Sequence, residues 1–171
     1  MFDITDLALG SVEVLAARLH VVSFHLLDQS VSTPAARVID CFEVACSFVD
    51  VLQARDNIDD YVLYSSHLIY RTIVIAACIL LRVLRSKLCE VVDVPATEQR
   101  YFSVVNLLKR RSLVNNDLDA KNAAILVMLW HSKTALRKAD GSYDGLRVRT
   151  QTRGVSVDCK VSRTNVTDPV L

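Results

Sequence analysis

His67 and Arg71 form the pair of side chains in this sequence with the clearest chemical potential. They are four residues apart, so a helix would place both on one face, and the segment around them is strongly apolar. A guanidinium in such a helix needs an anion against it. We expect either a structural carboxylate from the preceding helix, with Asp40, Glu43 and Asp50 as candidates, or a small anionic effector.

Other histidines and cysteines do not show the spacing of a metal site. His20 and His25 are five residues apart, so they lie on different faces of a helix, and neither has a ligand partner three or four residues away. Cys41 and Cys46 have the same spacing and lie among apolar residues, where cysteine packs as a small hydrophobic side chain. The sequence predicts no metal and no cofactor.

Motifs for catalysis are not recognisable in the chain. The sequence lacks a glycine-rich phosphate loop, a nucleophile elbow, a zinc-protease motif and a pair of carboxylates at catalytic spacing. We therefore expect a protein that is not an enzyme. The basic run 109–111 is explained by the dipole at a helix end, and Trp130-His131 indicates either a core tryptophan or the wall of a pocket.

The composition limits the possible classes of protein. The chain has 171 residues, and 20 Lys+Arg against 19 Asp+Glu leave a net charge of +1, which disfavours functions that need a strong overall field. A hydrophobic fraction of 51% is too high for a disordered chain. Only 4 Gly and 3 Pro disfavour a turn-rich β-sandwich, so a single helical domain is expected.

The cysteines and the apolar segments bear on the compartment. Five cysteines form no CxxC pair, and the first ten residues lack the basic start of a secretory signal. These features predict an intracellular, reducing compartment. The most apolar run, 72–81, is about half the length of a bilayer span and is interpreted as part of a buried core helix.

Apolar residues at spacings of three and four predict five helices, over about 4–27, 34–54, 57–91, 94–111 and 117–138. Asn57 and Asp117 are the expected N-caps of the third and fifth helices, with Asp59 and Asp60 in the first turn of the third. Because that helix is apolar on nearly every face between 68 and 84, it should lie at the centre.

The predicted fold is therefore all-α, an orthogonal or solenoid-like bundle of five helices with a central apolar helix and an irregular C-terminal tail. Residues 1–145 form the helical unit, and residues 146–171 form a divergent tail that we expect to be poorly ordered. Within the tail, two stretches of alternating residues flank Arg153-Gly154 and locally resemble a β-hairpin.

Three segments of the chain resemble a known family when they are taken together. They are VIDCFEVAC (38–46), LIYRTIVIAA (68–77) with LLRVL (80–84), and SLVNNDL (112–118) followed by Leu129-Trp130. In this order and spacing they resemble the C-terminal half of the regulatory (middle homology) domain of fungal binuclear zinc cluster transcription factors, in the subgroup of the leucine-biosynthesis regulator. The most specific element is the turn Asn115, Asn116 and Asp117 with the Leu-Trp that follows.

The resemblance covers about residues 30–150 and has two departures. Asp119 and Lys121 stand where the family usually has Pro and Arg, and residues 154–171 bear no likeness to the helix that continues the family domain. The cysteine cluster that binds zinc and DNA in the family has no counterpart in this chain. The resemblance thus implies no zinc in this chain and no direct DNA contact.

What the resemblance implies is a regulatory or interaction segment of a nuclear transcription regulator, the part that senses effectors and restrains activation. Its expected partners are a small anionic effector, other proteins, or a second copy held through exposed apolar surface. The high apolar fraction also fits an alternative, a stand-alone helical scaffold or dimerisation module without a transcriptional role.

Overall fold

The described part of the chain is mainly α-helical, which confirms the predicted all-α class. The computed structural model describes residues 4–27, 35–112, 117–132, 149–151 and 154–156. In the first helix, side chains are described only for residues 12–24. The helices are α1 (Ile4–Leu27), α2 (Ala35–Asp59), α3 (Tyr61–Tyr64), α4 (His67–Leu84), the 3-10 helix η1 (Lys87–Glu90), α5 (Val94–Arg111) and α6 (Leu118–His131).

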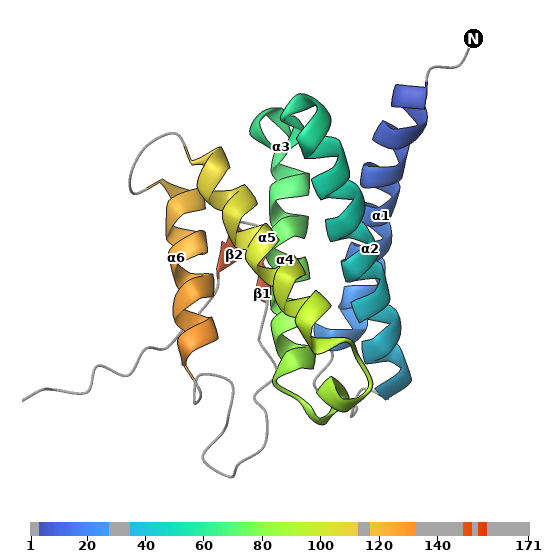
Figure 1. Ribbon diagram of the computed structural model, residues 1–171, viewed down its shortest axis with the longest axis vertical. Coiled ribbons are helices and arrows are strands. Elements are labelled where there is room, and N and C mark those ends of the chain that lie inside the picture. Colours follow the sequence, from blue (N-terminus) through green and yellow to red (C-terminus); the bar gives the residue numbers. More distant parts are fainter. Residues whose placement is uncertain (1–3, 28–34, 113–116, 133–148, 152–153, 157–171) are drawn as a thin grey trace, which may run out of the picture.

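The long helices are arranged around α4 (Figure 1). α1, α2 and α4 lie side by side and run in alternating directions, α5 crosses at a slant, and α6 packs on the far side of α5. α4 contacts α1, α2, η1, α5 and α6, so it occupies the centre predicted for the apolar third helix. The long helices that follow one another in the sequence thus pack together, and α4 contacts both the first long helix, α1, and the last, α6.

Burial of α4 explains this arrangement. Every residue from Thr72 to Leu81 is buried, whichever side of the helix it occupies. By length and composition α4 is the one described helix that could cross a membrane, but 72% of it is buried inside the bundle. A helix that is apolar on all sides needs neighbours on all sides, and the amphipathic helices around it provide them.

The neighbouring helices turn their apolar residues towards this core. In α1 the inward residues Val12, Ala16 and Leu19 recur at spacings of four and three and are fully buried. α2 lies between α1 on one side and α4 and α5 on the other. More than one face of α2 is therefore buried. Both Cys41 and Phe48 are inaccessible to solvent.

The predicted helix from 57 to 91 was wrong at both ends. Asn57 lies within α2, which continues to Asp59, and Asp60 ends that helix in the left-handed conformation with φ 52°. After the single turn α3, Ser66 is the N-cap of α4. Asparagine and aspartate favour turns as well as helix starts, so the acidic run after Asn57 could signal either one. α4 itself ends at Leu84, and η1 follows.

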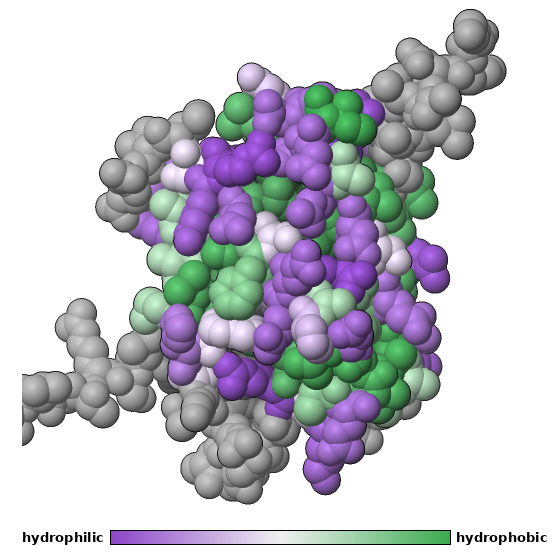
Figure 2. All heavy atoms as spheres, in the orientation of Figure 1, coloured by the Kyte–Doolittle hydropathy of each residue, from purple (hydrophilic) through white to green (hydrophobic). Residues whose placement is uncertain are grey.

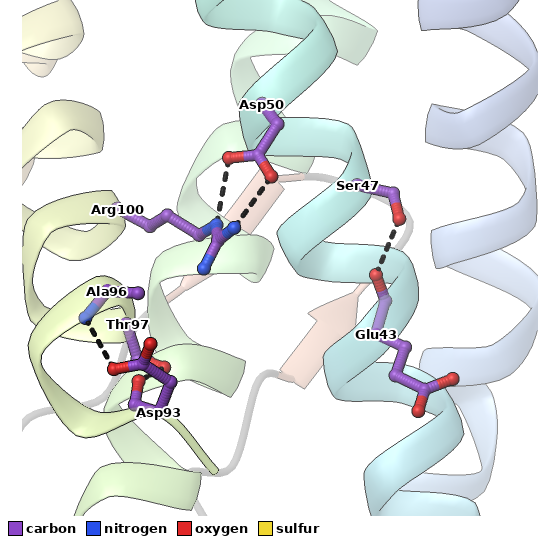
Figure 3. A network of polar contacts seen from close by, with 7 residues as sticks. All are labelled: Glu43, Ser47, Asp50, Asp93, Ala96, Thr97 and Arg100. Carbon is purple, nitrogen blue, oxygen red and sulfur yellow. Dashed lines mark hydrogen bonds and ion pairs between the residues drawn. The ribbon is translucent and has the colours of Figure 1, made fainter.

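Two helix starts that the sequence predicts are confirmed. The side chain of Asp93 accepts a hydrogen bond from the backbone N–H of Ala96 at 3.1 Å, at the start of α5 (Figure 3). Asp117 accepts one from the N–H of Ala120 at 2.8 Å, at the start of α6. Each carboxylate satisfies an amide that the first turn leaves without an intrahelical partner.

The last described element is a two-stranded antiparallel ribbon. β1 (Arg149–Gln151) pairs with β2 (Gly154–Ser156), with Arg149 opposite Ser156. This pairing confirms the hairpin predicted around Arg153-Gly154. The expected end of the fifth helix near residue 138 and the rest of the predicted tail lie outside the described residues, as do Asn115 and Asn116.

Candidate functional site: Arg71 and the polar corners of the bundle

Arg71 lies on α4 and is partly buried. Its Nε atom is buried and has no hydrogen-bond partner in the described part of the chain. Within the same residues Arg71 forms no ion pair with a carboxylate, so the structural partner expected from α2 is not found there. Arg71 is therefore a guanidinium with unused donor capacity next to the core, which is a feature of anion-binding positions.

The three carboxylates proposed for Arg71 are placed elsewhere. Asp50 forms a bidentate ion pair with Arg100 of α5, with two nitrogen–oxygen distances of 2.8 Å (Figure 3). Asp40 and Glu43 are exposed. Helical spacing predicts which face of α2 bears the acids, but α5 as well as α4 packs against α2, and α5 supplies the cation for Asp50.

The charge of Arg71 acts on a histidine, His20. His20 of α1 lies 3.0 Å, Nε2 to Oγ1, from Thr72 of α4, and the Thr72 hydroxyl donates to the Leu68 carbonyl at 2.8 Å. Since that hydroxyl has one hydrogen, His20 must donate from Nε2. Burial and, secondly, the charge of Arg71 lower the pKa of His20. The imidazole is thus held in its neutral form.

His67 does not share its surroundings with Arg71. Its side chain is exposed, and its ring lies 5.6 Å from the ring of Tyr70, centroid to centroid, at an angle of 37°. Its charge acts on Asp119 of α6, whereas the charge of Arg71 acts on His20 of α1. The two residues are one turn apart as predicted, but no described residue is a partner of both.

A polar cluster at the junction of α4, α5 and α6 was not predicted. We call it the corner cluster, and it consists of Tyr70, Arg111, Asp119 and Asn122. The guanidinium of Arg111 lies over the Tyr70 ring at 5.1 Å and 3.6 Å from the Asp119 carboxylate, and Asn122 is hydrogen bonded to the Tyr70 hydroxyl. The cluster therefore connects three helices through one arginine and one tyrosine.

Two residues of the corner cluster, Tyr70 and Asp119, have raised pKa values because they are partly buried. Burial raises the pKa of Tyr70. Burial also raises the pKa of Asp119, and the charges of Arg111 and His67 partly offset that rise. The sequence signal for this cluster was the basic run 109–111. The run lies in the last turn of α5, as predicted from the helix dipole, and the local sequence did not indicate that Arg110 and Arg111 also form ion pairs with distant acids.

Arg110 has a structural role of its own. It donates to the Asp56 carboxylate at 2.7 Å and to the Asp60 carboxylate at 2.5 Å. Asp56 is 2% exposed, and it also accepts the backbone N–H of Val62 at 2.9 Å. Arg110 thus holds the end of α5 against the corner between α2 and α3, and it neutralises a buried carboxylate.

Trp130 belongs to an aromatic cluster that packs partly on the core. Its ring stacks on Tyr101 at 5.2 Å and meets Phe102 edge to face at 4.9 Å. Arg85 lies over the indole at 5.6 Å and also donates to the Trp130 carbonyl. The hydroxyl of Tyr101 donates to the Leu126 carbonyl at 2.8 Å. Of the two interpretations of Trp130, this packing favours the core tryptophan.

The cysteines resemble packed hydrophobic side chains. Cys41, Cys46 and Cys89 are free thiols, and burial raises the pKa of both Cys41 and Cys46 to about 11. Such thiols stay protonated at neutral pH and are weak nucleophiles. No group of three histidine, cysteine or acidic side chains that could hold a metal occurs among the residues the structure describes.

Comparisons of the chain with protein-family models, with curated proteins and with solved structures found no match. Arg71 offers donors for an anion, whereas Arg110 and Arg111 form ion pairs that join helices, and the buried Arg55 pairs with Asp59 of its own helix.

Exchanging the two arginines for leucine should separate their roles. Arg71→Leu leaves no described carboxylate without its cation, so we expect the free energy of unfolding to change by less than about 1 kcal/mol. Arg110→Leu leaves the buried Asp56 unpaired and should lower it by roughly 3 kcal/mol. Urea unfolding followed by far-UV circular dichroism measures both. A loss of similar size for Arg71→Leu would show that a structural anion faces it.

The pKa of His20 predicts a pH effect on stability. A folded pKa below 6.5, the value of an unperturbed histidine, means that the unfolded chain binds more protons when the pH falls through that window. The His20 contribution therefore destabilises the fold below pH 6.5 and vanishes above it. We expect the stability difference between wild type and His20→Gln to shift in favour of the variant on acidification. Parallel stability curves from thermal melts would contradict this.

Proposed function

We propose that this chain is a regulatory or interaction segment of a transcription regulator of the fungal binuclear zinc cluster type. In this proposal it binds effectors or proteins and restrains activation, and another part of the regulator contacts DNA. The support is the ordered resemblance of the segments 38–46, 68–84 and 112–118, together with an all-α fold in which these segments lie on α2, on α4 and at the start of α6.

The observation that carries the proposal is the contact between the helices that bear the motif segments. Arg85, directly after the second segment, donates to the carbonyl of Trp130 in the third. Tyr70 of the second segment is hydrogen bonded to Asn122 of α6, and Asp117 of the family-like turn caps that helix. The helices that carry the second and third segments are thus joined by hydrogen bonds, and α2, which carries the first segment, packs against α4, as expected for parts of one domain.

Arg71 is the position at which we expect an anionic effector to be recognised. Its buried Nε has no acceptor among the described residues, and a carboxylate or phosphate group would supply one. A neutral His20 beside it adds no second positive charge, so a singly charged anion is enough to balance the site. The proposed effector class is therefore a small molecule with one carboxylate group.

A stand-alone scaffold or dimerisation module is the second candidate. It is favoured by large apolar residues that are exposed on α1, among them Val21 and Phe24. Such side chains on the outer face of a helix indicate a binding surface more often than chance exposure. This candidate explains the surface but not the resemblance of the three segments.

A reporter assay tests the proposal. The chain is inserted between a heterologous DNA-binding domain and an activation domain, and reporter output is compared with that of the same fusion without the chain. We expect the intact chain to lower output. The variant Arg110→Leu, which should destabilise the bundle, should restore it, whereas Arg71→Leu should keep the restraint.

Mapping the full transcript provides the control for this assay. We expect an upstream, in-frame cluster of six cysteines that begins with a CxxC pair. An open reading frame without that cluster would contradict the transcriptional proposal and favour the scaffold. Equal reporter output with and without the chain would also contradict it.

A further inference from the structure

The outer face of α1 carries an exposed apolar stripe. We call it the outer stripe, and it consists of Val14, Ala17, Val21 and Phe24. Val14 is 65% exposed, Val21 69% and Phe24 71%, and Ala17 is exposed as well. Because these side chains bury little of their apolar surface in the bundle, they contribute little to the stability of the described fold.

The outer stripe lies on the side of α1 that faces away from the bundle. The buried residues Val12, Ala16 and Leu19 point inwards, and with 100° per residue the outer stripe is centred nearly opposite to them. α1 is the edge helix of the bundle (Figure 1), and it packs against α2 and α4. A surface helix of a globular protein normally has a polar outer face, so a second apolar face indicates a second packing partner.

The spacing of the outer stripe is that of a coiled-coil seam. Its residues are separated by three, four and three positions, which places Val14 and Val21 at heptad position a, and Ala17 and Phe24 at position d. Valine at position a is common in parallel two-stranded coiled coils, in which leucine is the usual residue at position d. Ala17 at position d allows a close approach of the two helices.

The charges beside the seam are self-complementary. Glu13 occupies a g position and Arg18 the following e position, and both side chains are exposed. In a parallel pair, position g of one helix faces the next position e of its partner, so Glu13 of each copy would meet Arg18 of the other. Arg18 has no ion pair within the described residues. Glu13 accepts the Tyr61 hydroxyl at 2.6 Å through Oε1, which leaves Oε2 for a second copy.

We propose that the outer stripe binds the outer stripe of a second copy of this chain, in a parallel α1–α1 homodimer. The two bundles then lie on opposite sides of the seam, because the buried face of α1 is opposite to the outer stripe. α1 is already helical through its contacts with α2 and α4, so pairing does not have to nucleate a helix. The proposal rests on α1 alone and is independent of the transcriptional proposal.

Sedimentation equilibrium of the full chain tests the dimer. We expect a concentration-dependent dimer for the wild type. Val21→Asp should raise the dissociation constant roughly a hundredfold or more, because both copies lose an apolar contact and gain a carboxylate in the seam. Ile58→Asp is the matched control, since Ile58 is 75% exposed but lies at the end of α2, and it should have no effect. Circular dichroism checks that both variants stay folded.

Two outcomes of this experiment would overturn the proposal. A wild-type chain that stays monomeric at all concentrations would show that another kind of partner, or none, covers the outer stripe. A dimer that Val21→Asp and Ile58→Asp affect equally would show that the copies associate through a different surface.

The orientation of the pair has its own test. Arg18→Glu should weaken the dimer by placing Glu13 opposite another carboxylate, and adding Glu13→Arg in the same chain should restore it. In a parallel pair, Ala17→Cys faces its own copy and should form an intermolecular disulfide under mild oxidation. A double variant that remains as weak as Arg18→Glu, or an Ala17→Cys chain that does not cross-link as a dimer, would contradict parallel pairing.

Discussion

The apolar circumference of α4 is the constraint on which the rest of the structure depends. Between Thr72 and Leu81 the helix presents buried side chains in every direction, so one amphipathic neighbour could not remove it from water. The chain surrounds it with α1, α2, α5 and α6, each of which contributes an apolar face. Figure 2 shows hydrophilic and hydrophobic residues mixed over the face of the molecule that it draws.

Packing of the apolar faces restricts the angles between helices, and ion pairs add specific contacts between particular helices. Arg100 joins α5 to Asp50 of α2, and Arg110 joins the end of α5 to Asp56. Arg111 joins α5 to Asp119 of α6. Three arginines of α5 therefore hold it to α2 and α6. Arg71 differs from them because its charge acts on His20 and it forms no ion pair with a described carboxylate, which supports the proposal that it binds an anion.

The sequence was sufficient to predict the features that depend on local pattern. The apolar run identified α4 as the central helix, and Asp93 and Asp117 identified two helix starts, because N-capping uses an amide only three residues away. The end of α2 was not predictable in this way. Asn57 and Asp60 are compatible with a turn or with a helix start, and the left-handed conformation at Asp60 decides between them.

The candidate site was predicted less well, since it depends on distant contacts. The spacing of His67 and Arg71 placed them on one helix, but it carried no information on the helices that pack beside each of them. The partners of Arg110 lie fifty or more residues away along the chain, so its basic run resembled an ordinary helix end. The tertiary arrangement, and not the local sequence, determines which acid each arginine meets.

Amide hydrogen exchange is the most direct measurement of the central claim that the bundle forms around α4. The account predicts that amides from Thr72 to Leu81 exchange most slowly, and only through global unfolding, with a free energy equal to that from urea denaturation. Amides in the exposed first turn of α2 and at the end of α6 should exchange through local opening. Exchange of the α4 core that is as fast as that of these helix ends would contradict the account.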